Sequence, residues 1–257
     1  MLLYPLIWMV SSSFKPSEFI FSDAGLWPRG FTLANYVEGW NALGTSFSTF
    51  FLNSFVVAIG SIVGNLVSCS LAAFAFARLR FRLRKFWFSI MLGTMMLPHH
   101  VVLIPQYVLF SKIGWVDTFL PLVVPKFLAV DAFFIFLMVQ FIRGLPRELD
   151  DAAKIDGCGF FATYWRIILP LTMPALATTA IFTFIWTWND FMTPLIYLTS
   201  PENYTVPLGL RAFMDSEGES SWGPLFAMSV VSLGPIFGFF LAGQKYLVRG
   251  VATTGMK

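Results

Sequence analysis

The sequence predicts an all-α, polytopic membrane protein with about six transmembrane helices, and three observations support this prediction. Hydrophobic residues make up 57% of the 257 residues and charged residues 12%, a composition far from that of soluble globular domains. Apolar runs long enough to cross a bilayer, which takes about 20 residues, recur along the chain. Basic residues gather in alternate connections between these runs. The charged residues are too few to solvate two soluble domains, so residues 1–257 are predicted to form a single membrane domain.

The chain begins with a short apolar run and a long polar connection. Residues 1–10 are apolar but cover about half of a span, so we expect the end of a truncated first helix. This run lacks the basic start and the small-residue cleavage site of a signal peptide. Residues 14–48 mix Pro28 and several glycines with Trp27 and Trp40, which is typical of short interfacial helices in an external loop.

Five further spans are predicted, each an apolar run bounded by turn residues or charges. They cover residues 49–77, 86–110, 119–142, 171–198 and 225–247. In the run 86–110, Pro98 and Pro105 interrupt the helix around His99 and His100. Neighbouring residues diverge by about 100° on a helix, so the two histidines cannot face one metal ion.

The second and fourth spans carry features that predict packing partners. Gly60 and Gly64 lie four residues apart in the run 49–77, a spacing that lets another helix approach closely. Lys126 and Asp131 lie towards the outer part of the run 119–142. Lys126 is able to extend its amine to the interface, whereas Asp131 requires an aqueous or protein partner.

Residues 143–170, which we name the acidic loop, form the longest polar interruption in the second half of the chain. Pro146 suits the first turn of a helix, acidic residues follow it, and Gly157 supplies a stop, so a helix is predicted from about Pro146 to Asp156. One face of this helix is predicted to carry Leu149, Ala152, Ala153 and Asp156. A helix of about three turns is marginal by itself and needs a partner.

The distribution of basic residues orients the chain. Twelve lysines and arginines fall in the connections on the side of the acidic loop or in the C-terminal tail: Arg78, Arg80, Arg82, Arg84, Lys85, Arg143, Arg147, Lys154, Arg166, Lys245, Arg249 and Lys257. The other five fall on the opposite side: Lys15, Arg29, Lys112, Lys126 and Arg211. The positive-inside rule therefore places the acidic loop and the C-terminus in the cytoplasm, with residues 14–48 and 199–224 outside. The N-terminus is also expected in the cytoplasm if the first span is complete.

The acidic loop resembles the "EAA" loop in the permease subunits of ATP-binding-cassette importers. Asp151-Ala152-Ala153, Gly157, Ile167 and Leu169-Pro170 match that motif in spacing, with aspartate in place of glutamate at Asp151. The resemblance implies a cytoplasmic coupling helix that docks on an ATPase subunit. The residues expected to dock are Glu148, Leu149, Asp150, Asp151, Ala152, Ala153, Asp156 and Gly157.

A second resemblance concerns the solute. Trp188-Asn189-Asp190 is similar to a phrase of the sugar-importing permeases, which implies a translocation pathway for a sugar or oligosaccharide. Alternatively, Asn189 and Asp190 cap or fix a kink before Pro194. In maltose-type permeases the loop that matches residues 199–224 reaches into the solute-binding protein. The implied partners are a second permease chain, two ATP-binding subunits that hold ATP and Mg, the external sugar-binding protein and the bilayer of a bacterial inner membrane.

The sequence contains no motif typical of several other classes of protein. A Walker phosphate loop, a zinc-protease motif, a Cys-x-x-Cys pair and nucleic-acid-binding motifs are missing, so this chain is predicted to be a translocation subunit and not an enzyme, without a cofactor or metal of its own. Cys69 and Cys158 imply no disulfide framework. The competing hypothesis is an ion-coupled secondary transporter that uses Asp131, Asp190 and the pair His99 and His100 as its relay. An intramembrane hydrolase is a third reading of the same groups.

Overall fold

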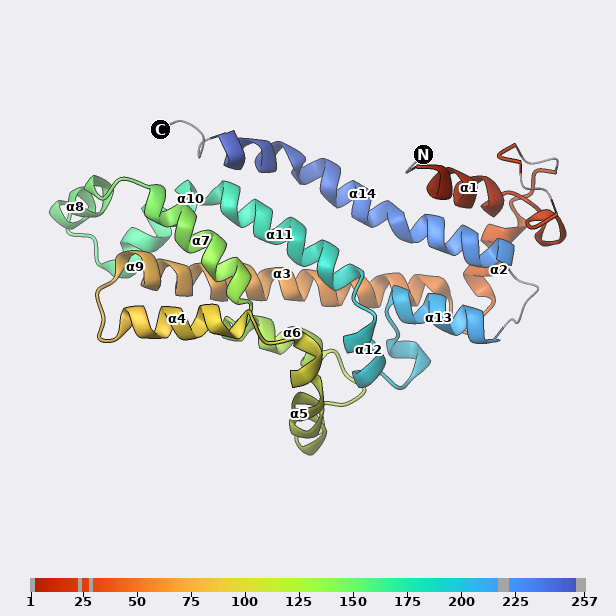
Figure 1. The fold of residues 1–257 in the computed structure, drawn as a ribbon, viewed down its shortest axis with the longest axis horizontal. Helices are drawn as coiled ribbons and strands as arrows, with labels where there is room; N and C mark the ends of the chain where they lie inside the picture. The colour runs from red at the N-terminus through yellow and green to blue at the C-terminus, as the bar shows by residue number, and fades with distance from the viewer. Residues whose placement is uncertain (1–2, 23–24, 28–29, 217–221, 253–257) are drawn as a thin grey trace. The chain divides into compact units, whose positions relative to one another are not determined.

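A computed structural model of the chain describes residues 3–22, 25–27, 30–216 and 222–252, and these residues form helices joined by short connections (Figure 1). The described part contains no β-strand, which confirms the all-α class. The chain divides into two compact units: Met1–Val57, Val116–Phe119 and Trp188–Gly238 form the first, and Ala58–Trp115, Leu120–Thr187 and Phe239–Lys257 the second. The prediction of a single membrane domain stays a prediction.

The first unit contains short helices and the beginnings of two long ones. Its elements are α1 (Tyr4–Ser13), η1 (Ser17–Phe19), α2 (Ala34–Asn41), the start of α3 (Phe47–Arg78), α12 (Met192–Tyr197), η4 (Pro201–Asn203), α13 (Val206–Ser216) and the start of α14 (Trp222–Ala252). Aromatic side chains fill its core, where Trp188 contacts the rings of Phe51 and Phe55. The helix α2 shows that residues 14–48 contain a short helix, and the interfacial position of this segment stays a prediction.

Asp117 organises the connections of the first unit. Its backbone adopts a left-handed conformation with φ of 62°, and its carboxylate accepts hydrogen bonds from the backbone amides of Thr199 and Ser200, each at 2.9 Å. The Ser200 hydroxyl also donates to it. These hydrogen bonds, with the Ser200 hydroxyl first among them, lower the pKa of Asp117 well below its ordinary value. The segment between α12 and η4 is thereby fixed to the connection between α5 and α6.

The second unit contains the acidic loop and most of the long helices. Its elements are the remainder of α3, α4 (Arg84–Thr94), α5 (His99–Lys112), α6 (Leu120–Val123), η2 (Val124–Leu128), α7 (Ala132–Gly144), α8 (Glu148–Ile155), α9 (Phe160–Thr163), the π-helical turn η3 (Tyr164–Ile168), α10 (Leu169–Leu171), α11 (Met173–Trp188, as far as Thr187) and the end of α14. Apolar residues of α3, α7, η3 and α11 form its core, among them Phe74, Met138 and Ile168. Figure 1 shows α8 at one end of this unit, past the ends of α3 and α7.

Three helices in the described part of the chain are long and apolar enough to cross a membrane. They are Phe47–Arg78, Leu120–Gly144, which includes short breaks, and Trp222–Lys245, and a fourth span results if the bent pair Phe160–Leu171 and Met173–Trp188 is counted as one. Counted by helix length and composition, the described residues therefore contain fewer than the predicted number of about six spans. Helix α3 agrees closely with the predicted run 49–77. In α3, Gly60 faces Val123 at the end of α6, and Gly64 faces Lys126 and Phe127 of η2, so the small residues admit this segment of the same chain.

Three of the predicted spans and one predicted helix need correction. Residues 86–110 are not one helix, because the backbone is extended at Pro98 and separates α4 from α5. The run 171–198 ends as a helix at Trp188, and α12 follows after a break. Asp131 lies near the middle of Leu120–Gly144 and not towards one end, directly before α7. The helix of the acidic loop begins at Glu148 and not at Pro146, and ends at Ile155.

Candidate functional site

Helix α8 carries the acidic residues of the loop at its N-terminal end. Glu148, Asp150 and Asp151 lie in its first turn, where carboxylates complement the partial positive charge of the helix N-terminus. Lys154 in the last turn forms an exposed ion pair with Asp151 at 3.1 Å. The sequence therefore favours this short helix through charge as well as through its alanines.

Gly157 ends α8 by a left-handed turn. Its φ is 76°, its amide donates to Lys154 O at 3.0 Å, and the Cys158 amide donates to Ala153 O at 2.8 Å. These two bonds are the pattern of a Schellman C-cap, in which glycine avoids the steric penalty of a Cβ atom. No heavy atom lies within 4 Å of an ideal Cβ built on Gly157, so the requirement for glycine is conformational and not a matter of space.

Arg78 anchors α8 to the end of α3. Its guanidinium lies 3.0 Å from Asp150 Oδ2, and it donates to the Leu145 carbonyl at 2.9 Å. The Arg78 side chain is 4% exposed, so this pair is largely removed from water, unlike the pair of Lys154 and Asp151. An ion pair with a buried, planar guanidinium fixes geometry far better than an exposed one.

The free surface of α8 differs from the face predicted for docking. Ala153 is buried within this chain and Leu149 is half-buried, so the predicted face of Leu149, Ala152, Ala153 and Asp156 is not a single exposed face. The side chains left exposed on α8 and its C-cap are Glu148, Asp151, Ala152, Lys154, Ile155 and Asp156. Ile155 was not among the predicted docking residues, yet it is 87% exposed. Its apolar character within an acidic segment was the available signal.

The chain returns from α8 through an irregular helix. After Gly159, residues Phe160–Leu171 include the π-helical turn η3, and the axis then bends by 75° into α11. The Tyr164 hydroxyl lies 2.7 Å from the Ser70 hydroxyl of α3. An apolar groove of about 450 Å³ runs beside this contact, lined in part by Val67, Phe161 and Trp165. The loop is thus attached to α3 at Ser70 as well as at Arg78.

The predicted pathway residues lie at the break between α11 and α12. Trp188 is buried in the aromatic core of the first unit, and its indole donates to Ser232 O at 3.1 Å. Asp190 accepts a hydrogen bond from the Thr193 amide at 3.1 Å, which is the capping arrangement considered as the alternative. Asn189 is exposed and has further contacts. Their role in translocation stays a prediction.

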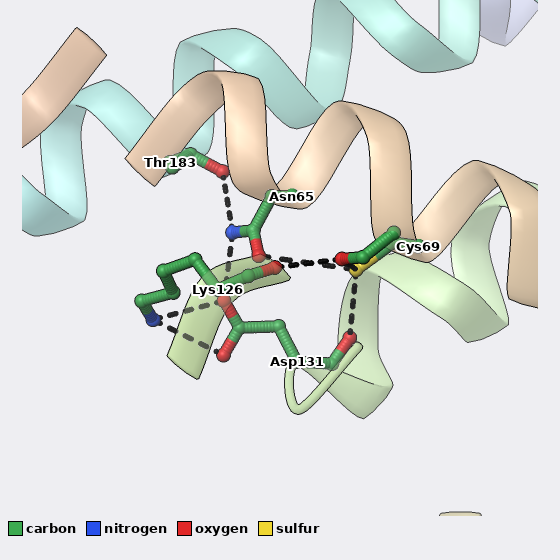
Figure 2. A network of polar contacts seen from close by, with 6 residues as sticks. Asn65, Cys69, Lys126, Asp131 and Thr183 are labelled. Atoms are coloured by element: carbon green, nitrogen blue, oxygen red, sulfur yellow. Dashed lines mark hydrogen bonds and ion pairs between the residues drawn. The ribbon is translucent and has the colours of Figure 1, made fainter. Parts of the chain in front are cut away.

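A polar network lies inside the second unit, and we use this name for Asn65, Ser68, Cys69, Lys126, Asp131 and Thr183 (Figure 2). Lys126 Nζ lies 2.9 Å from Asp131 Oδ2, and Asn65 Nδ2 donates to the same oxygen at 2.7 Å. Asn65 also donates to Thr183 Oγ1 at 3.1 Å. The need for a partner at Asp131 was predicted, but its partner Asn65 was not, and neither was the bond from Asn65 to Thr183. These contacts join residues of α3 and α11 to the residue that precedes α7.

The two acidic residues of the hypothetical ion relay each contact different partners. Asp131 is compensated by Lys126, and Asp190 caps α12. Helix α5 begins at His99, but the side chains of His99 and His100 lie outside the described part of the structure. Among the described residues, no group of three or more His, Cys, Asp or Glu side chains is arranged to hold a metal ion. Cys69 and Cys158 are free thiols.

Comparison with known proteins places this geometry among transport proteins. The model of the family "Binding-protein-dependent transport system inner membrane component" matches residues 64–253. The chain is 35% identical over 254 residues to the probable ABC transporter permease protein YurM of Bacillus subtilis, with 99% of this chain and 83% of YurM covered. It is 33% identical over 255 residues to the trehalose/maltose transport system permease protein MalG of Thermococcus litoralis, with 99% and 91% covered.

A solved structure agrees in fold. One chain in the crystal structure of a bacterial ABC transporter involved in the import of the acidic polysaccharide alginate superposes with a TM-score of 0.85 at 23% identity. The superposition covers 96% of this chain and 91% of that chain. At this identity the likeness establishes the fold alone.

Proposed function

The chain belongs to the family of binding-protein-dependent transport system inner membrane components, and on that premise we propose that it forms half of the pore of an ATP-binding-cassette importer for a sugar or oligosaccharide. It is a multi-pass membrane protein and a transport permease. The observation that carries the proposal is α8: a short acidic helix, largely exposed, whose end is fixed by Gly157 and whose base is fixed by Arg78.

The proposed assembly contains a second permease, two ATP-binding subunits and an external solute-binding protein. ATP and Mg belong to the ATP-binding subunits, and this chain holds no cofactor. In the inner membrane of a bacterium, the basic connections and the C-terminus face the cytoplasm. Residues 199–224 then face the solute-binding protein.

The proposed mechanism is alternating access driven through α8. Closure of the ATP-binding subunits displaces the docked helix as a rigid body, because its ends cannot yield independently. Arg78 passes the displacement to α3, and the Tyr164 contact with Ser70 passes it to α3 a second time. The two permeases thereby rock between inward-open and outward-open states. The energy comes from ATP binding in the partner, and this chain transmits it.

A saccharide is the proposed solute class on the strength of the relatives. Two relatives are named for saccharide transport. They are the trehalose/maltose permease of T. litoralis and the arabinooligosaccharides transport system permease protein AraQ of Halalkalibacterium halodurans, which is 33% identical over 258 residues. The phrase Trp188-Asn189-Asp190 supports the same class through its resemblance to sugar-importing permeases. The ion-coupled alternative has weaker support, since Asp131 is compensated by Lys126.

A pair of glycine substitutions tests the coupling role of α8. Gly157→Ala forces a side chain into φ of 76° and costs about 1 kcal/mol or more in the turn. Gly159→Ala is the matched control, because its φ is −74° and no heavy atom lies within 4 Å of its ideal Cβ atom. We expect Gly157→Ala to lower the amount of ATPase subunit that copurifies with the permease, and Gly159→Ala to leave this amount unchanged.

Gly157→Pro gives the stronger version of the same test. Proline cannot adopt a positive φ, so the Schellman turn is lost. We expect neither stable copurification nor uptake. If Gly157→Pro retained both the complex and transport at wild-type levels, α8 would not be the coupling element.

A further inference from the structure

The span Leu120–Gly144 is interrupted at its centre. After η2 the backbone turns left-handed at Ala129, with φ of 55°, and α7 begins at Ala132. Helix α3 supports the interruption from one side, because the Ser68 hydroxyl donates to the Lys126 carbonyl at 2.6 Å. Non-helical backbone at membrane depth occurs where protein buries it or where it lines a water-filled cavity.

The interruption lies halfway across the expected bilayer. At 1.5 Å per residue, Asn65 is about 20 Å along α3 from Arg78, and Asp131 is about 20 Å from the end of α7 at Gly144. Thr183 is about 15 Å from the start of α11 at Met173. A hydrocarbon layer is about 30 Å thick, so these three residues share its middle, where Asn65 donates to both Asp131 and Thr183.

The polar network has a closed side and an open side. Asn65 is fully buried and Thr183 nearly so. In contrast, the side chains of Lys126 and Asp131 are 28% and 26% exposed. Figure 2 shows the Lys126 amine directed towards the Asp131 carboxylate, with Asn65 above the pair in this view. A charged pair at mid-depth is too costly to expose to hydrocarbon, so its open side faces the interior of the helix bundle or an aqueous space and not lipid.

We propose that Lys126 and Asp131 line the translocation pathway at the bilayer centre and hydrogen bond to the hydroxyl groups of a neutral saccharide as it passes. This inference rests on the proposed function and adds a solute contact to it. The ammonium supplies donors and the carboxylate supplies acceptors, which is the combination that a polyhydroxylated solute requires. The pair carries no net charge, so it gives no electrostatic preference for an acidic solute. Discontinuous helices at the bilayer centre form the solute sites of many carriers.

Thiol labelling tests whether the open side is wet. In a Cys69→Ala and Cys158→Ser background, we compare Lys126→Cys with Val63→Cys, both reacted with a membrane-impermeant methanethiosulfonate in the intact transporter. Val63 is the matched control, since it lies on α3 within one turn of Asn65 and is 46% exposed. Reaction requires a hydrated thiolate, so we expect Lys126→Cys to react at least about tenfold faster than Val63→Cys. Equal, slow rates in both the nucleotide-free and vanadate-trapped complex would overturn the proposal.

Uptake kinetics separate a solute contact from a structural one. The double substitution Lys126→Met and Asp131→Leu removes both charges together, which avoids an unpaired charge at mid-depth. We expect copurification of the ATPase subunits and thermal stability close to wild type, with a several-fold lower uptake per ATP hydrolysed. Unchanged uptake per ATP would overturn the solute contact. If no ATPase subunit copurified with the unmodified chain, the proposed importer function itself would be overturned.

Discussion

Gly157 and Ile155 define the end and the free surface of α8. The positive φ of Gly157 can be predicted from the sequence, because glycine adopts that conformation at the least cost. The exposure of Ile155 is a property that depends on which face of α8 the rest of the chain covers. An apolar side chain that is 87% exposed on an acidic helix is expected to enter a partner's surface.

Ile155→Ser should weaken ATPase docking. Loss of an isoleucine that is fully buried on binding costs about 1.5 to 3 kcal/mol, which corresponds to about a 10- to 100-fold weaker complex. Pull-down of the ATPase subunits at graded concentration measures the change. Ile113→Ser is the control, since Ile113 is 49% exposed in the connection expected on the other side of the membrane. Equal effects of the two substitutions would argue against docking through Ile155.

Asp117 gives a pH-dependent prediction. Its pKa is lowered in the folded protein by bonds from Ser200 and Thr199, so the charged carboxylate stabilises the fold. That stabilisation is complete above the ordinary aspartate pKa of about 4 and is lost as the pH falls below it. Asp117→Asn should therefore lower the thermal midpoint at neutral pH, and the difference from wild type should shrink in acid. Glu202→Gln, at an exposed position of the same segment, is the control.

Helices α3 and α8 are joined through a side-chain contact between residues far apart in the chain. Arg78 donates to a carbonyl 67 residues away and pairs with Asp150 in the first turn of α8. A helix as short as α8 gains its stability from such contacts and not from propensity. In the proposed mechanism, this link makes α3, the longest helix described, the element that responds when α8 moves.

Arg78→Met should uncouple transport from ATP hydrolysis. It leaves Asp150 without its buried partner and loosens α8 by about 1 to 3 kcal/mol, while the exposed docking residues remain in place. The expected result is ATPase copurification near wild type with less solute moved per ATP hydrolysed. Lys154→Met breaks the exposed pair with Asp151 and should change little, about 0.5 kcal/mol or less. Identical transport in Arg78→Met and wild type would remove Arg78 from the transmission.

On the scale of the whole molecule, several breaks divide the apolar helices. The breaks at Pro98, at Ala129 and after Trp188 divide apolar runs that composition alone presents as continuous. Breaks of this kind are unfavourable in lipid unless protein or water satisfies the backbone. Their presence fits a protein that opens a path through the bilayer.

The energy source distinguishes an importer subunit from an ion-coupled carrier. We expect uptake in vesicles to require the ATP-binding subunits and internal ATP, and to persist when a protonophore and a sodium ionophore collapse both gradients. The reason is that the proposed driving contacts lie between α8 and the ATP-binding subunit, whereas Asp131 is balanced by Lys126. Uptake that survives without any ATPase subunit but stops with the gradients would instead support the ion-coupled carrier.

The sequence by itself determined the membrane class, the extent of α3, and the stop at Gly157. These properties depend on composition or on residues within a few positions of each other, so they are visible without coordinates. Only the tertiary structure decided which face of α8 is free, that Arg78 holds Asp150, and that Asn65 donates to Asp131. Those contacts connect residues more than 60 positions apart, and their partners are chosen by packing between helices, which local patterns do not encode.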